Sequence, residues 1–236
     1  MYGDTDATFR GLVAACASIG AECPLAADGS TASQIEAKIF KLMDDLKQNP
    51  VVYKKFVFDY SLFRGYLNIA LYGPDTWQSF TRVIDGLIKG NSSAISVLQS
   101  ADNAASAGER RYGIACGDTS ARGRDEARKA IKEVMDISKV SGDIGVQFIS
   151  QCAQWPFEAK ERYTGPLEGV KTAHPVLLFQ NRFDPVCSMG AAKNMTAVFE
   201  DAVLVEQNGF GVSSFPLPQE FLRESSLTSR VFLGWE

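Results

Sequence analysis

Apolar residues recur every three or four positions over much of the first hundred residues, which is typical of helices that bury one face. From 35 to 46 this stripe predicts an amphipathic helix that ends at Asn49-Pro50. Further helices are predicted at 61–72, with Ser61 as N-cap, and at 77–89. The residues expected to face the core are Ile35, Ile39, Leu42, Met43 and Leu46 in the first helix and Trp77, Phe80, Val83, Ile84, Leu87 and Ile88 in the third.

Beyond about residue 108 short apolar runs without polar alternation appear, which indicates strands covered on both faces. These runs fall at 112–116, 175–179 and 202–206, and helical segments are predicted at 124–138 and 189–199. The expected fold class is therefore α/β. We expect a helical region at 1–108, a core of strands and helices at 109–211, and an irregular tail at 212–236. The residues expected to face inward from the 124–138 helix are Ala127, Ile131, Val134 and Met135.

Asp184 lies just beyond the apolar run at 175–179 and the polar residues that follow it. In open α/β sheets, ligands and catalytic side chains gather at the carboxyl ends of the strands. Asp184 is therefore the main candidate for a catalytic carboxylate. Asp118 also follows a predicted strand, the one at 112–116, and is the alternative.

The composition limits the classes of protein to consider. A chain of 236 residues with 45% hydrophobic residues can bury a substantial core. Its net charge of -4 argues against a nucleic-acid partner. No apolar run approaches the roughly 20 residues of a membrane span, so no membrane partner is expected. The first residues show no signal peptide.

The cysteines point to an oxidising compartment. Cys16 and Cys23 flank a short segment, a spacing compatible with a local disulfide. Cys116 and Cys152 are the other disulfide candidates, and four cysteines allow three pairings. Cys187 is left over, either as a free thiol or as the partner of a cysteine outside this sequence. Zinc ligand spacing is absent, so no metal is expected.

Two sequons make Asn91 and Asn194 candidates for glycosylation. Such triplets also occur by chance. Together with the expected disulfides, they favour an extracellular protein as the complete parent of this chain.

The order strand, acid, helix, strand and glycine turn from 175 to 211 resembles the last third of an α/β-hydrolase. Further motifs lie at 9–25, 71–77, 90–91, 113–118, 152–156, the Asp184 turn and 208–211. Their order and spacing narrow the resemblance to the C-terminal part of the tripeptidyl-aminopeptidase-like (TAP-like) serine hydrolases of peptidase family S33, the group beside the prolyl iminopeptidases. This resemblance covers residues 1–211.

This resemblance implies that the helical region is a cap over the sheet and that Cys116 and Cys152 form a disulfide. It implies that Asp184, rather than Asp118, is the acid of a Ser-His-Asp triad. The activity it implies is that of a serine exopeptidase that releases short peptides from free N-termini and needs no cofactor. Other small acyl substrates remain open, because the fold hosts many acyl transfers.

Two members of that triad do not occur in the sequence. The nucleophile elbow Gly-x-Ser-x-Gly is absent, and the nearest segment, 211–215, lacks the second glycine. The single histidine, His174, precedes the strand whose far end carries Asp184. A strand of about seven residues, each spanning ~3.3 Å, therefore separates the two side chains. His174 is therefore interpreted as a loop residue and not as the base. The position of the base in the family, after the glycine turn, is occupied here by Val212.

Two explanations account for these absences. The favoured one is an incomplete chain, inactive alone, that lacks the N-terminal half with the elbow and ends wrongly before the histidine. Val212-Ser213 can be encoded by a splice-donor sequence, so the tail at 212–236 is interpreted as mis-spliced. The alternative is a non-catalytic binding or regulatory protein derived from the same fold. A half sheet is expected to expose an apolar edge and face.

Overall fold

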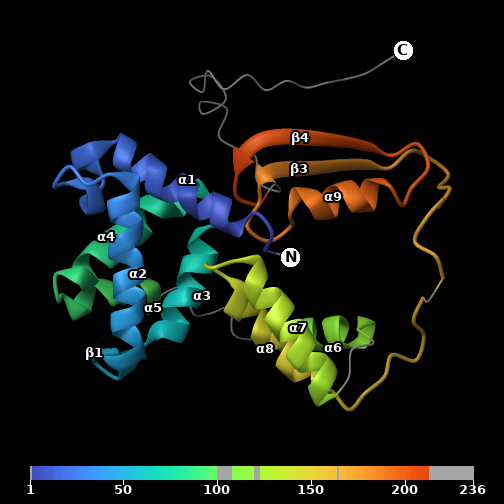
Figure 1. Cartoon of the computed structure of the whole chain (residues 1–236), viewed down its shortest axis with the longest axis horizontal. Coiled ribbons are helices and arrows are strands. Elements are labelled where there is room, and N and C mark those ends of the chain that lie inside the picture. The colour runs from blue at the N-terminus through green and yellow to red at the C-terminus, as the bar shows by residue number, and fades with distance from the viewer. Residues whose placement is uncertain (1, 100–107, 120–122, 164, 213–236) are drawn as a thin grey trace.

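The structure is a computed structural model that describes residues 2–99, 108–119, 123–163 and 165–212. Its first part consists mainly of helices packed side by side (Figure 1). The elements are α1 (Thr5–Ser18), α2 (Ala32–Gln48), the hairpin strands β1 (Val51–Tyr53) and β2 (Phe56–Phe58), α3 (Tyr60–Ala70), α4 (Trp77–Ile88) and α5 (Ser96–Gln99). Four 3-10 turns accompany them: η1 (Gly20–Glu22), η2 (Pro24–Ala26), η3 (Pro74–Thr76) and η4 (Ser92–Ile95).

The three helices predicted in this part are confirmed, with one correction at a helix start. α2 begins with a capping box, in which the side chains of Thr31 and Gln34 each accept a hydrogen bond from the other residue's backbone N–H. In α3 the predicted N-cap Ser61 is wrong, because Asp59 Oδ1 accepts the hydrogen bond from Leu62 N at 2.9 Å. A carboxylate here also interacts favourably with the positive end of the helix dipole.

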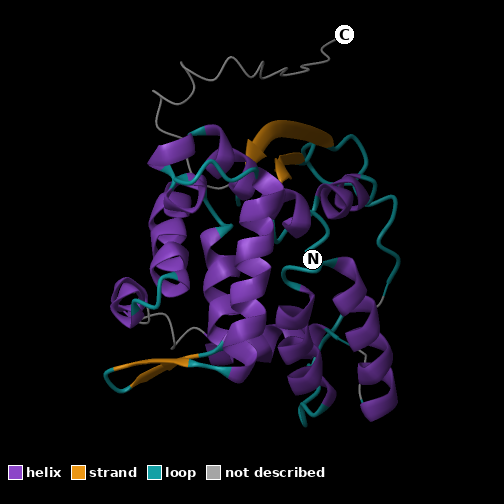
Figure 2. Ribbon diagram, turned by 60° about the vertical axis from the view of Figure 1, so that its left-hand side comes forward, coloured by secondary structure: helices purple, strands orange, loops and turns teal. Residues whose placement is uncertain are grey.

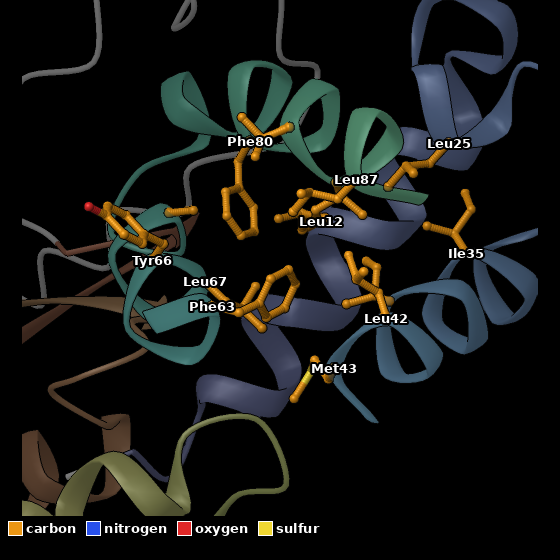
Figure 3. Close-up of a cluster of buried hydrophobic side chains, with 14 of the residues drawn as sticks. Leu12, Leu25, Ile35, Leu42, Met43, Phe63, Tyr66, Leu67, Phe80 and Leu87 are labelled. Atoms are coloured by element: carbon orange, nitrogen blue, oxygen red, sulfur yellow. The ribbon is translucent and has the colours of Figure 1, made fainter. Parts of the chain in front are cut away.

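One hydrophobic core joins α1, α2, α3 and α4. Leu12, Phe63 and Phe80, from three different helices, converge on it (Figure 3). The apolar stripe of α2 is buried as predicted, and in α4 only Ile88, at 44% exposure, departs from the prediction by lying open to solvent. The Cys16–Cys23 disulfide ties the end of α1 to the turn before η2. Most of the apolar burial that stabilises the molecule therefore lies before residue 100.

The strand predicted at 112–116 is wrong, because these residues belong to a helix. They lie in α6 (Gly108–Asp118), which is followed by α7 (Arg124–Ile137) and α8 (Gly142–Ala153). Tyr112 and Cys116 are one helical turn apart and both meet α8, through the Phe148 ring at 5.0 Å and through a disulfide to Cys152. A run of five apolar residues is compatible with a strand or with a helix. Here the contacts of Tyr112 and Cys116, four positions apart on one face, favour the helix.

α7 confirms the helix predicted at 124–138. Ala127 is buried and Ile131 and Val134 are half-buried, but Met135 is 53% exposed, so its predicted inward position is wrong. Two glycines of α8 explain how closely α7 approaches. An added Cβ would lie 2.8 Å from Met135 Cα at Gly142 and 2.8 Å from Val134 Cγ2 at Gly145.

A parallel strand pair ends the described chain. It consists of β3 (Leu177–Phe183), α9 (Met189–Thr196) and β4 (Val203–Phe210). Both predicted strands are confirmed but are longer than expected: 180–183 belong to β3 rather than to a polar turn, and 208–210 belong to β4 rather than to a glycine turn. The β1–β2 hairpin and this pair lie at opposite ends of the molecule (Figure 2). Helices with a small parallel sheet fit the predicted α/β class.

Among the described residues, α9 covers one face of the parallel pair along its length (Figure 1). On the other face Leu177, Phe179 and Val203 are 65%, 56% and 48% exposed, so the prediction of strands covered on both faces is wrong for this half of the pair. The predicted exposed apolar face is confirmed. Parallel sheets are normally covered on both sides, and the described residues supply a cover for one.

Candidate functional site

Asp184 follows β3 directly and is almost completely buried, with 1% of its surface exposed. Its Oδ1 accepts hydrogen bonds from the backbone N–H groups of Val186 and Cys187, both at 2.8 Å. Its Oδ2 is buried and has no hydrogen-bond partner among the residues that the structure describes. A buried carboxylate oxygen without a hydrogen-bond donor is unfavourable in free energy, so Oδ2 is available to accept a hydrogen bond from a further group.

The first turns of α1 hold the Asp184 turn in place. Thr5 Oγ1 donates to Pro185 O at 2.6 Å, and Thr8 Oγ1 donates to Phe183 O at 2.9 Å. Both threonines are fully buried. These contacts join residues about 180 positions apart, and we did not predict them. The signal in the sequence is two threonines three positions apart, which share one face of a helix.

The segment after β4 lies beside the Asp184 turn. Gly211 N donates to Phe183 O at 3.0 Å, and Val212 N donates to Tyr72 O at 2.9 Å. Because β3 and β4 are parallel, Val212 follows β4 at the same edge of the sheet at which Asp184 follows β3. The two residues therefore occupy neighbouring positions at the carboxyl ends of adjacent strands.

Gly211 is required in this segment for two reasons, so Gly211→Ala is expected to lower the free energy of unfolding by about 2 kcal/mol. Its φ is +94°, which side chains disfavour, and an added Cβ would lie 2.5 Å from Tyr72 O. Thermal unfolding should show a Tm lower by roughly 4–8 °C. Gly20→Ala is the control, because Gly20 has φ +56° but open space around its Cβ position. Equal losses in both variants would show that the approach to Tyr72 imposes no constraint.

The segment between α3 and α4, together with the first residue of α4, lies against this edge of the sheet. The Phe210 ring stacks on Phe183 at 4.7 Å and meets Trp77 edge-on at 5.6 Å. Tyr72 is 40% exposed, and partial burial, followed by the Asp184 carboxylate, raises the pKa of its hydroxyl. Trp77 Nε1 is buried without a hydrogen-bond acceptor among the described residues. The helical region therefore contributes two aromatic side chains, Tyr72 and Trp77, as one wall of the candidate site.

Cys187 is a free, exposed thiol next to the Asp184 turn. Although the residue is exposed, its sulfur is partly desolvated, and this desolvation, followed by the Asp184 carboxylate, raises the pKa of the thiol. The thiol therefore stays protonated at neutral pH, and a protonated thiol is a poor nucleophile. A role as nucleophile is therefore not supported for Cys187.

The other predicted residues lie away from Asp184. His174 is exposed before β3, at the end of the sheet opposite Asp184, as expected. Asp118 ends helix α6 instead of following a strand, so the reason for considering it is lost. Asn91 and Asn194 are exposed, the latter within α9. Ser213 and the rest of the tail lie outside the described residues.

Both predicted disulfides, Cys16–Cys23 and Cys116–Cys152, are present. Over the described ranges, His, Cys, Asp and Glu do not gather in a group that could bind a metal ion. None of the helices in those ranges is both long and apolar enough to cross a membrane.

Residues 139–220 match the α/β-hydrolase family model described as TAP-like protein. The match contains β3, Asp184, α9, β4 and Val212, and the elements before residue 139 lie outside it. The predicted resemblance to the C-terminal part of a TAP-like α/β-hydrolase is thus confirmed for this segment, and so is a hydrolase fold at this level. No curated protein matches the chain.

Proposed function

We propose that this chain carries the acid-bearing part of a serine hydrolase in which Asp184 orients the histidine of a Ser-His-Asp triad. The complete hydrolase would be an exopeptidase that releases short peptides from free N-termini by an acyl-enzyme route without a cofactor. A peptide or small acyl compound is the substrate of this proposal, with no nucleic-acid or membrane partner. The two disulfides are compatible with an extracellular location.

The observation that carries the proposal is the geometry of Asp184. One carboxylate oxygen is fixed by two backbone N–H groups, and the other is buried and free to accept a third donor. A triad acid works in this way, because it must hold the imidazole N–H and stabilise the imidazolium that forms during acyl transfer. Val212, beside Asp184 at the end of the neighbouring strand, marks where that imidazole would be attached.

The chain alone is proposed to be inactive. Its 236 residues contain no Gly-x-Ser-x-Gly elbow, and their single histidine lies at the other end of β3. Loss of the nucleophile or the base leaves at most the weak residual catalysis that binding and an oxyanion hole provide.

The test is to place a histidine at position 212 and measure the pKa of its imidazole. His174→Gln removes the only native imidazole, and Val212→His then introduces a single new one. An NMR pH titration should give an imidazole pKa about 1–2 units higher with Asp184 than with Asp184→Asn, because the carboxylate favours the charged imidazolium. The neighbouring Tyr72, Cys187 and Arg111 are the same in both variants, so their effects cancel.

The matched control is His174 in the otherwise native chain. It lies at the far end of β3, so Asp184→Asn should leave the NMR signals of its imidazole unchanged. Far-UV circular dichroism verifies that each variant is folded. Equal pKa values at position 212 with and without the carboxylate would overturn the proposed role of Asp184.

The alternative function is that of a non-catalytic binding or regulatory protein derived from the fold. The observation that favours it is the exposed apolar patch of Leu177, Phe179 and Val203, because exposed apolar patches commonly mark interaction sites. In such a protein Asp184 need not face position 212. A histidine there that does not respond to Asp184→Asn would therefore favour this alternative.

A further inference from the structure

β3 carries two adjacent amide side chains in its interior, Gln180 and Asn181, and both are 6% exposed. Buried polar side chains are costly unless they form hydrogen bonds, so each requires a structural reason. Gln180 Nε2 donates to Cys187 O at 2.6 Å, within the Asp184 turn. Asn181 Nδ2 donates to Gly211 O at 2.9 Å, 30 residues away in the sequence. The sequence placed both residues in a turn and therefore missed these contacts.

The irregularity in β4 makes room for the Asn181 side chain. Asn181 pairs with Gln207 and Phe183 with Phe210, so β4 has one more residue than β3 over this stretch. Gly209 lies in this bulge, where an added Cβ would be 3.4 Å from Asn181 Oδ1. The amide of Asn181 therefore lies against Gly209 and reaches the carbonyl of Gly211 beyond the bulge.

The peptide unit between Gly211 and Val212 is held at both of its polar ends. Its carbonyl accepts a hydrogen bond from Asn181, which belongs to the sheet. Its N–H, that of Val212, donates to Tyr72 O, which belongs to the helical region. Two fixed ends hold the orientation of this peptide plane, which includes the N–Cα bond of residue 212 and so constrains the position of its side chain.

We infer that Asn181 is a positioning residue that aims the side chain at position 212 toward Asp184. This inference rests on the proposed role of Asp184 and adds a second residue to that site. Asn181 acts through the Gly211 carbonyl and has no contact with a reacting atom. Without the hydrogen bond from Asn181, only the Tyr72 carbonyl holds the peptide plane. We therefore expect the contact between Asp184 and an imidazole at position 212 to weaken more than the fold does.

The test measures the same imidazole titration in variants of Asn181. In the His174→Gln, Val212→His background, the pKa difference between Asp184 and Asp184→Asn is determined with Asn181 and with Asn181→Leu. Leucine keeps the approximate volume of asparagine and removes the donor. The difference is expected to fall to less than about half of its value with Asn181, since a displaced imidazole interacts more weakly with the carboxylate.

Asn68→Leu is the matched control, because Asn68 is also a buried amide, 7% exposed, but its hydrogen bond, which it accepts from Ser141 Oγ, does not involve the peptide between Gly211 and Val212. It should lower the Tm but leave the pKa difference unchanged. If Asn181→Leu does not fold, Asn181→Ser replaces it, and its shorter donor should give an intermediate pKa difference.

The outcomes separate the two claims. A full pKa difference in the Asn181 variants overturns the positioning role and leaves the role of Asp184 intact. No difference even with Asn181 present overturns both. A loss of the difference that is matched by Asn68→Leu would mean that general destabilisation is the cause, and this also overturns the positioning role.

Discussion

Removal of the Cys116–Cys152 disulfide is expected to lower the free energy of unfolding by about 4 kcal/mol. The two cysteines are 36 residues apart, and the chain-entropy model gives about this value for a loop of that length. Among the described contacts of α6 with α8, the Tyr112 ring meets Phe148 at 5.0 Å, and Arg111 lies over the same ring at 4.8 Å. Urea unfolding of Cys116→Ala/Cys152→Ala, compared with the native chain, measures the loss.

The Cys16–Cys23 disulfide is the natural comparison. It closes a separation of only 7 residues, so Cys16→Ala/Cys23→Ala should lose less, about 2.5 kcal/mol. Both cysteines also lie in the main hydrophobic core, which keeps that region folded without the bond. The loop-length argument fails if the two variants lose equal stability or if the order is reversed.

Local patterns in the sequence predicted the elements with the strongest periodicity. The stripe of α2 was predicted because it depends on a regular spacing of apolar residues over a full element, and the strand before Asp184 was predicted from a continuous apolar run that ends in polar residues. Residues 112–116 were misassigned because a short apolar run without that spacing suits both a strand and a helix. The hairpin at 51–58 was missed for a related reason, since each of its strands has only three residues.

The contacts that complete the candidate site were not predictable from local patterns. Asp184 was identified from its position after a strand, which is a local feature. The supports of its surroundings, Thr5, Thr8 and Asn181, act across 30 to 180 residues of sequence. No periodicity encodes such partners. A buried polar residue in an apolar strand, such as Asn181, does indicate that a distant partner exists.

A partly buried ion pair joins the helical region to the segment that matches the TAP-like family. Arg64 in α3 is 4% exposed, and its Nε donates to Asp143 Oδ1 in α8 at 2.9 Å, with a second hydrogen bond from Nη2 to the same oxygen. Arg64 Nη1 also donates to Lys139 O at 2.7 Å, and Tyr60 donates to Asp143 Oδ2 at 2.9 Å. Both oxygens of Asp143 therefore accept hydrogen bonds from side chains of α3, whose first residue is Tyr60.

Asp143→Ala is expected to lower the free energy of unfolding by about 3 kcal/mol, because it leaves the Arg64 guanidinium buried without its counter-charge. For a chain of this size the Tm should fall by roughly 6–12 °C. Differential scanning calorimetry at neutral pH measures both quantities. The surface pair Lys41–Asp45, whose side chains are 76% and 56% exposed, provides the control, and Asp45→Ala should cost less than about 0.5 kcal/mol.

The double variant Arg64→Met/Asp143→Ala distinguishes an unpaired charge from lost packing. If the uncompensated guanidinium causes the loss, replacing it with an apolar side chain of similar length should recover most of the stability. If the double variant is as unstable as Asp143→Ala, lost packing is the cause and the ion-pair argument is wrong. The answer bears on the candidate site, because α3 leads to Tyr72, whose carbonyl holds Val212 beside Asp184. A pair that fixes α3 to α8 therefore also fixes the wall of the site to the segment that carries the acid.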